Sequence, residues 1–200
     1  MENTQLVFKV GLIGGIASGK TAALQYFKSL GIETFSADEI ARQLTQKKGS
    51  CFQTIINHCG HDYLLPNGEL NREMLRQKLI QEPSFKHWLE ALLHPLIQSI
   101  LIEKMNACHT PYCIVEIPLL KDKSPYQLDR VLYIKSSPQI QQSRLVSRGL
   151  SETHMKGMLQ LQIPEQEREQ LADDIVVNDQ SLNELHKQID KLHQFYLSHG

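Results

Sequence analysis

The 200-residue chain has no excess of either charge, because 21 Lys and Arg residues stand beside 22 Asp and Glu residues. Proteins whose main partner is a nucleic acid usually carry a basic surface field, so we do not expect nucleic acid as a partner. Long apolar runs are also missing. None approaches the roughly 18 residues that identify a membrane-spanning helix, so we expect no membrane partner either.

Cysteine is scarce, and none of the 4 cysteines belongs to a C-x-x-C pair. The first residues, MENTQLVFKVG, include an early acidic residue and lack the apolar core of a signal peptide. These features predict reduced thiols and a cytoplasmic location. Internal repeats and low-complexity linkers are absent as well, which excludes a repeat architecture.

Short apolar runs alternate with segments of helical periodicity along much of the chain. The runs that predict strands are residues 6–13, 32–36, 112–117, 130–135 and 174–178. Strands that alternate with helices are typical of a parallel β-sheet with helices on both faces. We therefore predict the α/β fold class.

Residues 37–111 interrupt this alternation, because they show helical periodicity and few strand candidates. Asn71 and Ser84 are suited to cap helices that begin directly after them. Pro95 lies inside the second of these helices and predicts a kink or a break there.

Residues 14–21, GGIASGKT, fit the pattern G-x-x-x-x-G-K-[ST] between a predicted strand and a predicted helix. The glycines let successive N–H groups converge on an anion, and the helix N-terminus adds positive potential. A chance match is expected in roughly one chain in a hundred of this length. The pattern predicts a nucleoside triphosphate site, with Lys20 on the β- and γ-phosphates and the Thr21 hydroxyl as a ligand of Mg²⁺.

The loop does not by itself identify the reaction, because the same cradle serves switches, motors and kinases. The N-K-x-D and D-x-x-G segments of a GTPase switch are absent, and a motor would usually be longer. The length of the chain favours a small-molecule kinase.

Asp38 follows the second predicted strand, whose carboxyl end lies at the same edge of a parallel sheet as the phosphate loop. A carboxylate at this edge could accept the proton of an acceptor hydroxyl. Acidic residues are also frequent at helix N-termini, so the spacing alone leaves a structural role equally open.

Further motifs follow in order: SADEIAR at 36–42, NGELNR at 67–72, LLHPLI at 92–97, IPLL at 117–120, QQSRLVSR at 141–148 and LADDIVVN at 171–178. With the phosphate loop, they resemble the dephospho-coenzyme A kinase family over residues 10–178, nearly the whole chain. The resemblance implies a phosphotransferase that moves a phosphoryl group from ATP, with Mg²⁺, to the ribose 3′-hydroxyl of dephospho-CoA. This is the last step of coenzyme A synthesis.

The resemblance also implies a P-loop kinase fold with a parallel β-sheet flanked by helices, plus a helical acceptor-binding insertion and a lid. The nucleotide-binding core would comprise residues 1–36, 112–140 and 170–200. Residues 37–111 would form the helical region that binds dephospho-CoA, and residues 141–169 the lid.

Individual roles follow from the same resemblance. Asp38 is expected to be the catalytic base, with Arg42 and His94 lining the acceptor side. Lys20 and Arg144 are expected to act on the transferring phosphate, although without the resemblance the arginines are more typical of solvated helix positions. The expected nucleotide-binding residues are Gly14, Gly15, Ile16, Ala17, Ser18, Gly19, Lys20, Thr21, Ala22, Arg148 and Asn178.

Several positions depart from the family pattern. Ala17 stands where glycine is usual, which is tolerable if its φ is negative. Ser36 replaces the first aspartate of a D-A-D segment and removes a carboxylate that could help to hold Mg²⁺. Lys121 and Asp122 stand where an aromatic residue and a glutamate are usual, and Asp122 could still supply a carboxylate.

Two other functions stay open. One is another P-loop kinase that acts on nucleotides or nucleosides. The other is an ATP-gated regulatory protein that has lost turnover, which the departures at Ser36 and Lys121 make conceivable. Turnover measured on a panel of acceptor substrates at equal ATP concentration distinguishes the first from a dephospho-CoA kinase. ATP binding without ADP release would support the second.

Overall fold

The computed structural model describes residues 7–149 and 162–200. The chain divides into two compact units: Met1–Ser36 with Ile102–Gly200, and Ala37–Leu101. We call the first the sheet unit and the second the helical unit. The boundary after Leu101 falls inside a helix, ten residues before the end that the sequence predicts for the helical region.

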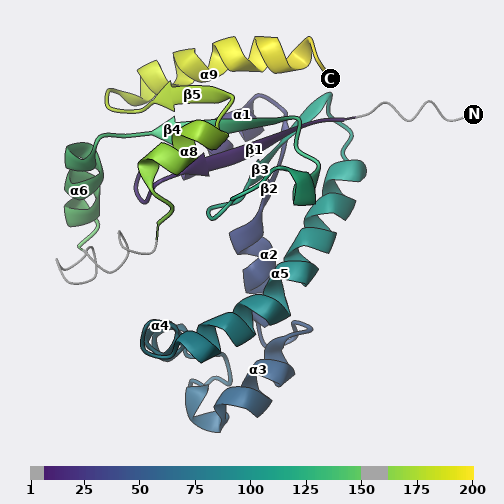
Figure 1. Ribbon diagram of the computed structural model, residues 1–200, viewed down its shortest axis with the longest axis vertical. Coiled ribbons are helices and arrows are strands. Elements are labelled where there is room, and N and C mark those ends of the chain that lie inside the picture. The colour runs from purple at the N-terminus through teal and green to yellow at the C-terminus, as the bar shows by residue number, and fades with distance from the viewer. Residues whose placement is uncertain (1–6, 150–161) are drawn as a thin grey trace, which may run out of the picture. The chain divides into compact units, whose positions relative to one another are not determined.

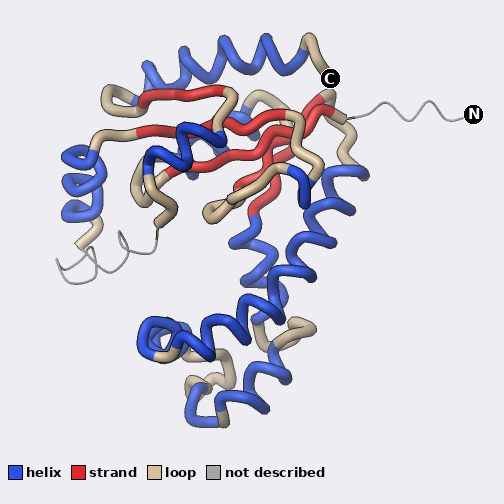
Figure 2. Tube along the Cα trace, viewed as in Figure 1, coloured by secondary structure: helices blue, strands red, loops and turns tan. Residues whose placement is uncertain are grey.

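The sheet unit is built on a five-stranded sheet in the order β2-β3-β1-β4-β5, and every neighbouring pair is parallel. Figures 1 and 2 show these strands beneath helix α9. The strands are β1 (Phe8–Gly14), β2 (Glu33–Ser36), β3 (Tyr112–Glu116), β4 (Arg130–Lys135) and β5 (Asp174–Val177). The predicted parallel sheet is therefore confirmed.

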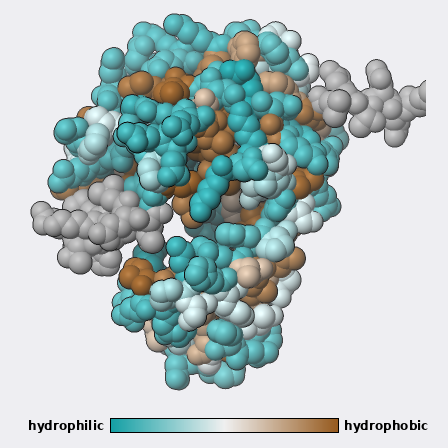
Figure 3. Space-filling view, in the orientation of Figure 1, coloured by the Kyte–Doolittle hydropathy of each residue, from teal (hydrophilic) through white to brown (hydrophobic). Residues whose placement is uncertain are grey.

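One face of the sheet is covered by α1 (Lys20–Ser29) and α9 (Leu182–Leu197), which contact each other. Their apolar residues and those of the strands form one buried cluster that includes Val10, Leu12, Ala23, Phe27, Ile114, Leu132, Ile134, Leu185 and Ile189. Figure 3 shows hydrophilic residues along the rim of this unit and apolar residues toward its middle. This cluster anchors the strand and the helix that flank the phosphate loop.

The opposite face of the sheet carries Ile13, Val115 and Tyr133, all buried, because successive side chains on a strand alternate between faces. Gly11 lies on this face, where an added Cβ would approach Leu128 Cδ1 to 2.7 Å. Helix α8 (Glu165–Leu171) contacts β4, and Arg168 of α8 lies over the Tyr133 ring.

The helical unit contains α2 (Ala37–Thr45), α3 (Phe52–Cys59), the 3-10 turn η1 (His61–Tyr63), α4 (Arg72–Gln81) and most of α5 (Pro83–Asn106). Its buried residues include Ile40, Leu44, Ile55, Ile56, Leu75 and Phe85. The predicted cap of α4 is confirmed, because Asn71 Oδ1 accepts a hydrogen bond from the Met74 amide at 3.2 Å.

Pro95 does not interrupt its helix, because α5 runs from Pro83 to Asn106. Of the predicted kink or break, the break is wrong and the kink stays a prediction. Pro95 and Ala91 are both exposed, so the Ala91 carbonyl that loses its usual N–H partner can be solvated by water. The start also differs, because Pro83 takes the first helical position and Ser84 lies inside the first turn.

The predicted lid lies partly outside the described residues, since residues 150–161 are not among them. Its first residues belong to α6 (Pro138–Ser147), and its last residues belong to α8. Within the described ranges, no helix is long and apolar enough to cross a membrane.

Candidate active site

The phosphate loop connects the carboxyl end of β1 to the first residue of α1. Gly19 adopts a φ of +104°, and a Cβ at this position would collide with the Asn178 amide, so only glycine fits. Lys20 folds back over the loop, where its Nζ donates to the carbonyl oxygens of Gly14 and Gly15 at 2.9 and 3.0 Å. The ammonium group therefore lies beside the loop in which the sequence predicts the phosphates.

Helix α1 begins within the loop, so the amides of its first turn point toward the loop's open side. The Ala23 amide is the first to bond within the helix, donating to the Gly19 carbonyl at 3.0 Å. Thr21 is exposed in this turn, and Ala22 follows it. A helix N-terminus of this kind favours an anion.

Ala17 is held with a φ of +55°, in the left-handed region. The condition under which the sequence makes alanine tolerable here, a negative φ, is therefore not met. The left-handed conformation costs a residue with a Cβ about 1–2 kcal/mol. Ala17 is nevertheless buried with Leu145 and Ile16, and this packing offsets part of the strain.

The carbonyl side of the loop is held by residues that follow β4 and β5. The Ser18 carbonyl oxygen accepts hydrogen bonds from Asn178 Nδ2 at 2.7 Å, Ser136 Oγ at 3.1 Å and Arg144 Nη1 at 3.2 Å. Three donors on one carbonyl fix the orientation of that peptide group. Ser136 is buried directly after β4, and sequence reasoning missed it.

Arg144 lies on α6 with its guanidinium group against the loop. It also donates to the carbonyl oxygens of Ala17 and Asn178, at 3.0 and 2.9 Å, and to Ser136 Oγ at 3.1 Å. These contacts tie Arg144 to the protein backbone, whereas Arg148 is exposed at the end of α6. The catalytic role of Arg144 stays a prediction.

Asp38 is the second residue of α2 and is exposed. It follows Ser36, the last residue of β2, by two positions, so its Cα lies within about 8 Å of the carboxyl end of that strand. Arg42 on α2 and His94 on α5 are also exposed. All three belong to the helical unit, and their roles stay predictions.

Glu116 is a carboxylate at the sheet edge that sequence reasoning missed. It ends β3, beside Ser36 in the register, and Ser36 Oγ donates to Glu116 Oε2 at 3.0 Å. Although Ser36 replaces an aspartate, Glu116 therefore supplies a carboxylate at the carboxyl ends of β2 and β3. A charged residue at the end of the buried run YCIVE was the available signal.

Asp122 has a local role in the structure. Its Oδ1 accepts hydrogen bonds from the Ser124 amide and hydroxyl at 3.0 and 3.1 Å. These bonds lower the pKa of Asp122. The carboxylate thereby bonds the first residue of the 3-10 turn η2 (Ser124–Tyr126).

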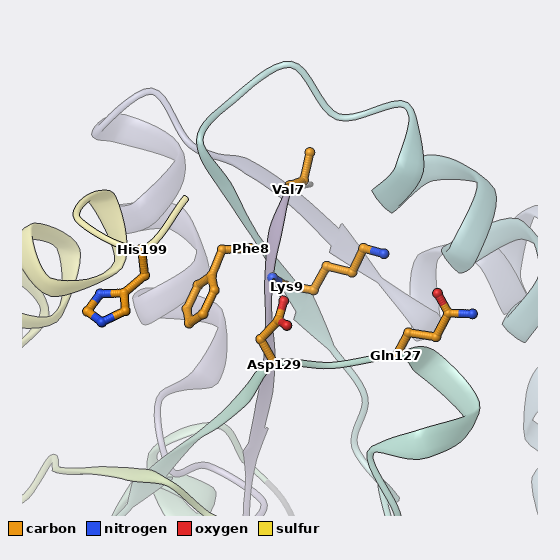
Figure 4. Close-up of a pocket in the computed structure, with 6 residues that line it drawn as sticks. All are labelled: Val7, Phe8, Lys9, Gln127, Asp129 and His199. Carbon is orange, nitrogen blue, oxygen red and sulfur yellow. Dashed lines mark hydrogen bonds between the residues drawn. The ribbon is translucent and has the colours of Figure 1, made fainter. Parts of the chain in front are cut away.

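A separate pocket of about 310 Å³ lies at the opposite edge of the sheet. Figure 4 shows its lining residues, Val7, Phe8, Lys9, Gln127, Asp129 and His199. They come from the start of β1, the segment before β4 and the residues after α9, and Asp129 Oδ2 accepts from the Lys9 amide at 2.7 Å. The phosphate loop follows the other end of β1, so this pocket lies away from the predicted nucleotide site.

A parallel sheet in the order 2-3-1-4-5 with a G-x-x-x-x-G-K-T loop after β1 defines a P-loop kinase fold. A shikimate kinase from Acinetobacter baumannii, solved in complex with shikimate, shares this fold with a TM-score of 0.55 at 13% identity, over 98% of this chain and 96% of that chain. A dephospho-CoA kinase from Campylobacter jejuni has a TM-score of 0.65 at 24% identity, over 96% of this chain and 98% of that chain.

The sequence identifies the family within this class. The family model described as dephospho-CoA kinase matches residues 8–184. A dephospho-CoA kinase of Legionella pneumophila (strain Paris) is 40% identical over 194 residues, which are 96% of each chain. The chain belongs to the dephospho-CoA kinase family, and the resemblance in its motifs is confirmed.

Proposed function

We propose that the chain transfers the γ-phosphoryl group of ATP to the 3′-hydroxyl of the dephospho-CoA ribose, giving coenzyme A and ADP. The observation that carries this proposal is the complete phosphate loop, Gly14 to Thr21, in a chain that the family model matches over residues 8–184. The loop supplies the donor site, and family membership indicates the acceptor.

In the proposed reaction, the loop amides and the start of α1 bind the β- and γ-phosphates. Lys20 Nζ lies next to the Gly14 and Gly15 carbonyls, and we expect it to exchange these contacts for phosphate oxygens. Its positive charge then stabilises the charge that spreads over the transferring group in the transition state.

Asp38 is proposed to accept the proton of the ribose 3′-hydroxyl as its oxygen attacks the γ-phosphorus. The carboxylate is exposed, and the chain connects it closely to the carboxyl end of β2. General base catalysis of this kind contributes about 10²–10⁴-fold to a rate. Arg42 and His94 are proposed to bind the acceptor, as part of a helical acceptor-binding region that comprises residues 37–111.

Mg²⁺ is proposed to bind with the nucleotide. The exposed Thr21 hydroxyl and the Glu116 carboxylate are oxygen donors, the ligand type that Mg²⁺ prefers. Thr21 would be a direct ligand, and Glu116 would hold a coordinated water. When bound, the ion neutralises negative charge on the β- and γ-phosphates.

Arg148 and Asn178 are proposed to complete the nucleotide site, together with Arg144. Residues 141–169 are proposed to act as a lid that excludes water, which otherwise competes with the ribose hydroxyl for the phosphoryl group.

Coupled measurement of ADP release tests the proposal, with dephospho-CoA, AMP and adenosine as acceptors. We expect turnover with dephospho-CoA alone. Asp38→Asn should reduce kcat by about 10²–10⁴-fold without changing the Kd of ATP. Glu39→Gln is the matched control, because Glu39 is the exposed acid next in sequence and should retain its activity.

Two outcomes would contradict the proposal. Turnover with AMP or adenosine in place of dephospho-CoA would indicate a kinase for nucleotides or nucleosides. Tight ATP binding without turnover on any acceptor would indicate an ATP-gated regulatory protein.

A further inference from the structure

A glutamine distant in sequence, Gln162, contacts the phosphate loop. Gln162 Oε1 accepts a hydrogen bond from the Ile16 amide at 2.7 Å, across 146 residues of sequence. A Cβ at Gly15 would come within 2.8 Å of the same oxygen. The glycine at position 15 therefore leaves the space through which the Gln162 carboxamide reaches the loop.

Arg168 holds this carboxamide from the other side. Its Nη1 donates to Gln162 Oε1 at 3.2 Å, and its guanidinium carbon lies 5.4 Å from the centre of the Tyr133 ring. Arg168 is only 8% exposed. Its Nε is buried and has no hydrogen-bond partner within the described ranges. A guanidinium group in such a place is costly unless its contacts are specific.

The Ile16 amide and Arg168 Nη1 both donate to the same end of the Gln162 carboxamide. Only the oxygen of a carboxamide can accept two hydrogen bonds, so this end is the oxygen. The carboxamide oxygen faces Ile16 and Arg168, so the Ile16 N–H is hydrogen-bonded within the protein. The amides at the start of α1 lie farther along the loop and are the ones suited to phosphate. Gln162 thus bonds the first part of the loop, at Ile16, and leaves the amides at the start of α1 available to phosphate.

We propose that Gln162 is a positioning residue for nucleotide binding and that Arg168 acts through it. The carboxamide fixes the Ile16 peptide, and this keeps the segment from Gly15 to Ala17 in the conformation that presents the phosphate cradle. The inference rests on the nucleotide site of the proposed function and is independent of the acceptor.

Calorimetric binding of ADP to the full chain tests the proposal without any turnover. Gln162→Met keeps the length of the side chain and removes the acceptor, so we expect the Kd of ADP to rise about fivefold, the effect of one hydrogen bond. Arg168→Met should give a similar or smaller rise. The double variant, Gln162→Met with Arg168→Met, should bind ADP no more weakly than Gln162→Met alone. Either change already disrupts the same hydrogen-bonded group of Ile16, Gln162 and Arg168, so their effects should not add.

A second measurement follows the Ile16 amide directly by hydrogen exchange in NMR spectra. We expect protection in the natural chain and in Gln162→Glu, which keeps an acceptor oxygen, and loss of protection in Gln162→Met. One matched control is Gln170→Met, at an exposed glutamine of α8 outside the proposed lid. The other is Arg130→Met, which removes a guanidinium group that lies over the Phe195 ring. Neither control should change ADP affinity or Ile16 exchange.

Unchanged or tighter ADP binding by Gln162→Met would overturn the positioning role, as would an Ile16 amide that stays protected in that variant. Additive losses in the double variant would overturn the role of Arg168. Inactivity toward dephospho-CoA would contradict the proposed function but would leave these ADP affinities unaffected, so the two failures can be told apart.

Discussion

Substituting Arg144 distinguishes an arginine that anchors the phosphate loop from one that only supplies charge to the phosphates. Its guanidinium group donates four hydrogen bonds, to the carbonyl oxygens of Ala17, Ser18 and Asn178 and to Ser136 Oγ. A lysine keeps the positive charge but cannot reproduce this planar fork of donors. Arg144→Lys and Arg144→Met therefore give different results for the two roles.

The expected loss of stability depends on which oxygens bonded by Arg144 keep another donor when it is substituted. Without Arg144, the Ser18 carbonyl keeps its bond from Asn178 Nδ2 at 2.7 Å, and the one hydroxyl hydrogen of Ser136 can bond either the Ser18 or the Asn178 carbonyl. The buried Ala17 carbonyl loses its donor, which costs about 1–3 kcal/mol, and the charged bond to Asn178 contributes about 1.5 kcal/mol more. We expect Arg144→Met to lower the free energy of unfolding by about 3 kcal/mol and Arg144→Lys by about 2 kcal/mol.

Urea unfolding followed by near-ultraviolet circular dichroism suits this test. The single tryptophan, Trp88, lies in the helical unit, whereas Tyr112, Tyr133 and Tyr196 are buried in the sheet unit and report on its packing. Arg148→Lys is the control, because Arg148 is exposed and its substitution should change stability by less than about 0.5 kcal/mol. An Arg144→Lys variant as stable as the natural chain, with kcat alone reduced, would refute the anchoring argument.

Three further predictions use the same reasoning. Ala17→Gly relieves about 1–2 kcal/mol of left-handed strain, but it loses a buried methyl group worth about 0.8 kcal/mol and frees the unfolded chain by about 0.4–1 kcal/mol. Urea unfolding should therefore show a change within about 0.8 kcal/mol in either direction, and a larger change would contradict this. Glu116→Gln should raise the Mg²⁺ concentration for half-maximal activity at least about tenfold and leave metal-free ADP binding intact; an unchanged Mg²⁺ dependence would exclude Glu116 from the ion's surroundings. Burial alone would raise the pKa of Asp173, but hydrogen bonds from Lys123 and the Val131 amide outweigh burial and lower this pKa. The stability from Asp173 is thus present above about pH 4, its unfolded pKa, and is lost as the pH falls through the lower folded pKa, so Asp173→Asn should flatten the acid side of the curve of unfolding free energy against pH.

Local patterns in the sequence were sufficient for the sheet and for much of its flanking helices. The run RVLYIK, residues 130–135, coincides with β4, and Asn71 caps α4 as its spacing predicts. Both are properties of neighbouring residues, so a short stretch of sequence contains the information. Pro95 did not specify a break, because a break depends on whether the freed carbonyl can be solvated, and that is set by exposure.

The support of the phosphate loop could not be predicted in the same way. Arg144 has the same residue type as Arg148 four positions later, yet one bonds the loop and the other is exposed. The left-handed φ of Ala17 follows from how the loop is held, and its residue type gives no sign of it. Gln162 meets Ile16 across 146 residues. Such contacts depend on how β4, β5 and α8 are placed in the sheet unit, which no local spacing specifies.

The two kinds of contact on the loop hold different peptide groups, one kind through carbonyl oxygens and the other through an amide. Ser136, Arg144 and Asn178 bind carbonyl oxygens at Ala17 and Ser18, while Gln162 binds the amide of Ile16. A loop held from both sides is ordered when the chain folds, so less conformational entropy remains to be lost when a nucleotide binds. Ala17 retains a strained φ only because its neighbours leave it no alternative. We therefore expect Gln162 to contribute to phosphate binding through the shape of the loop, and a loss of ADP affinity in Gln162→Met without a loss of global stability would distinguish this contribution from ordinary core packing.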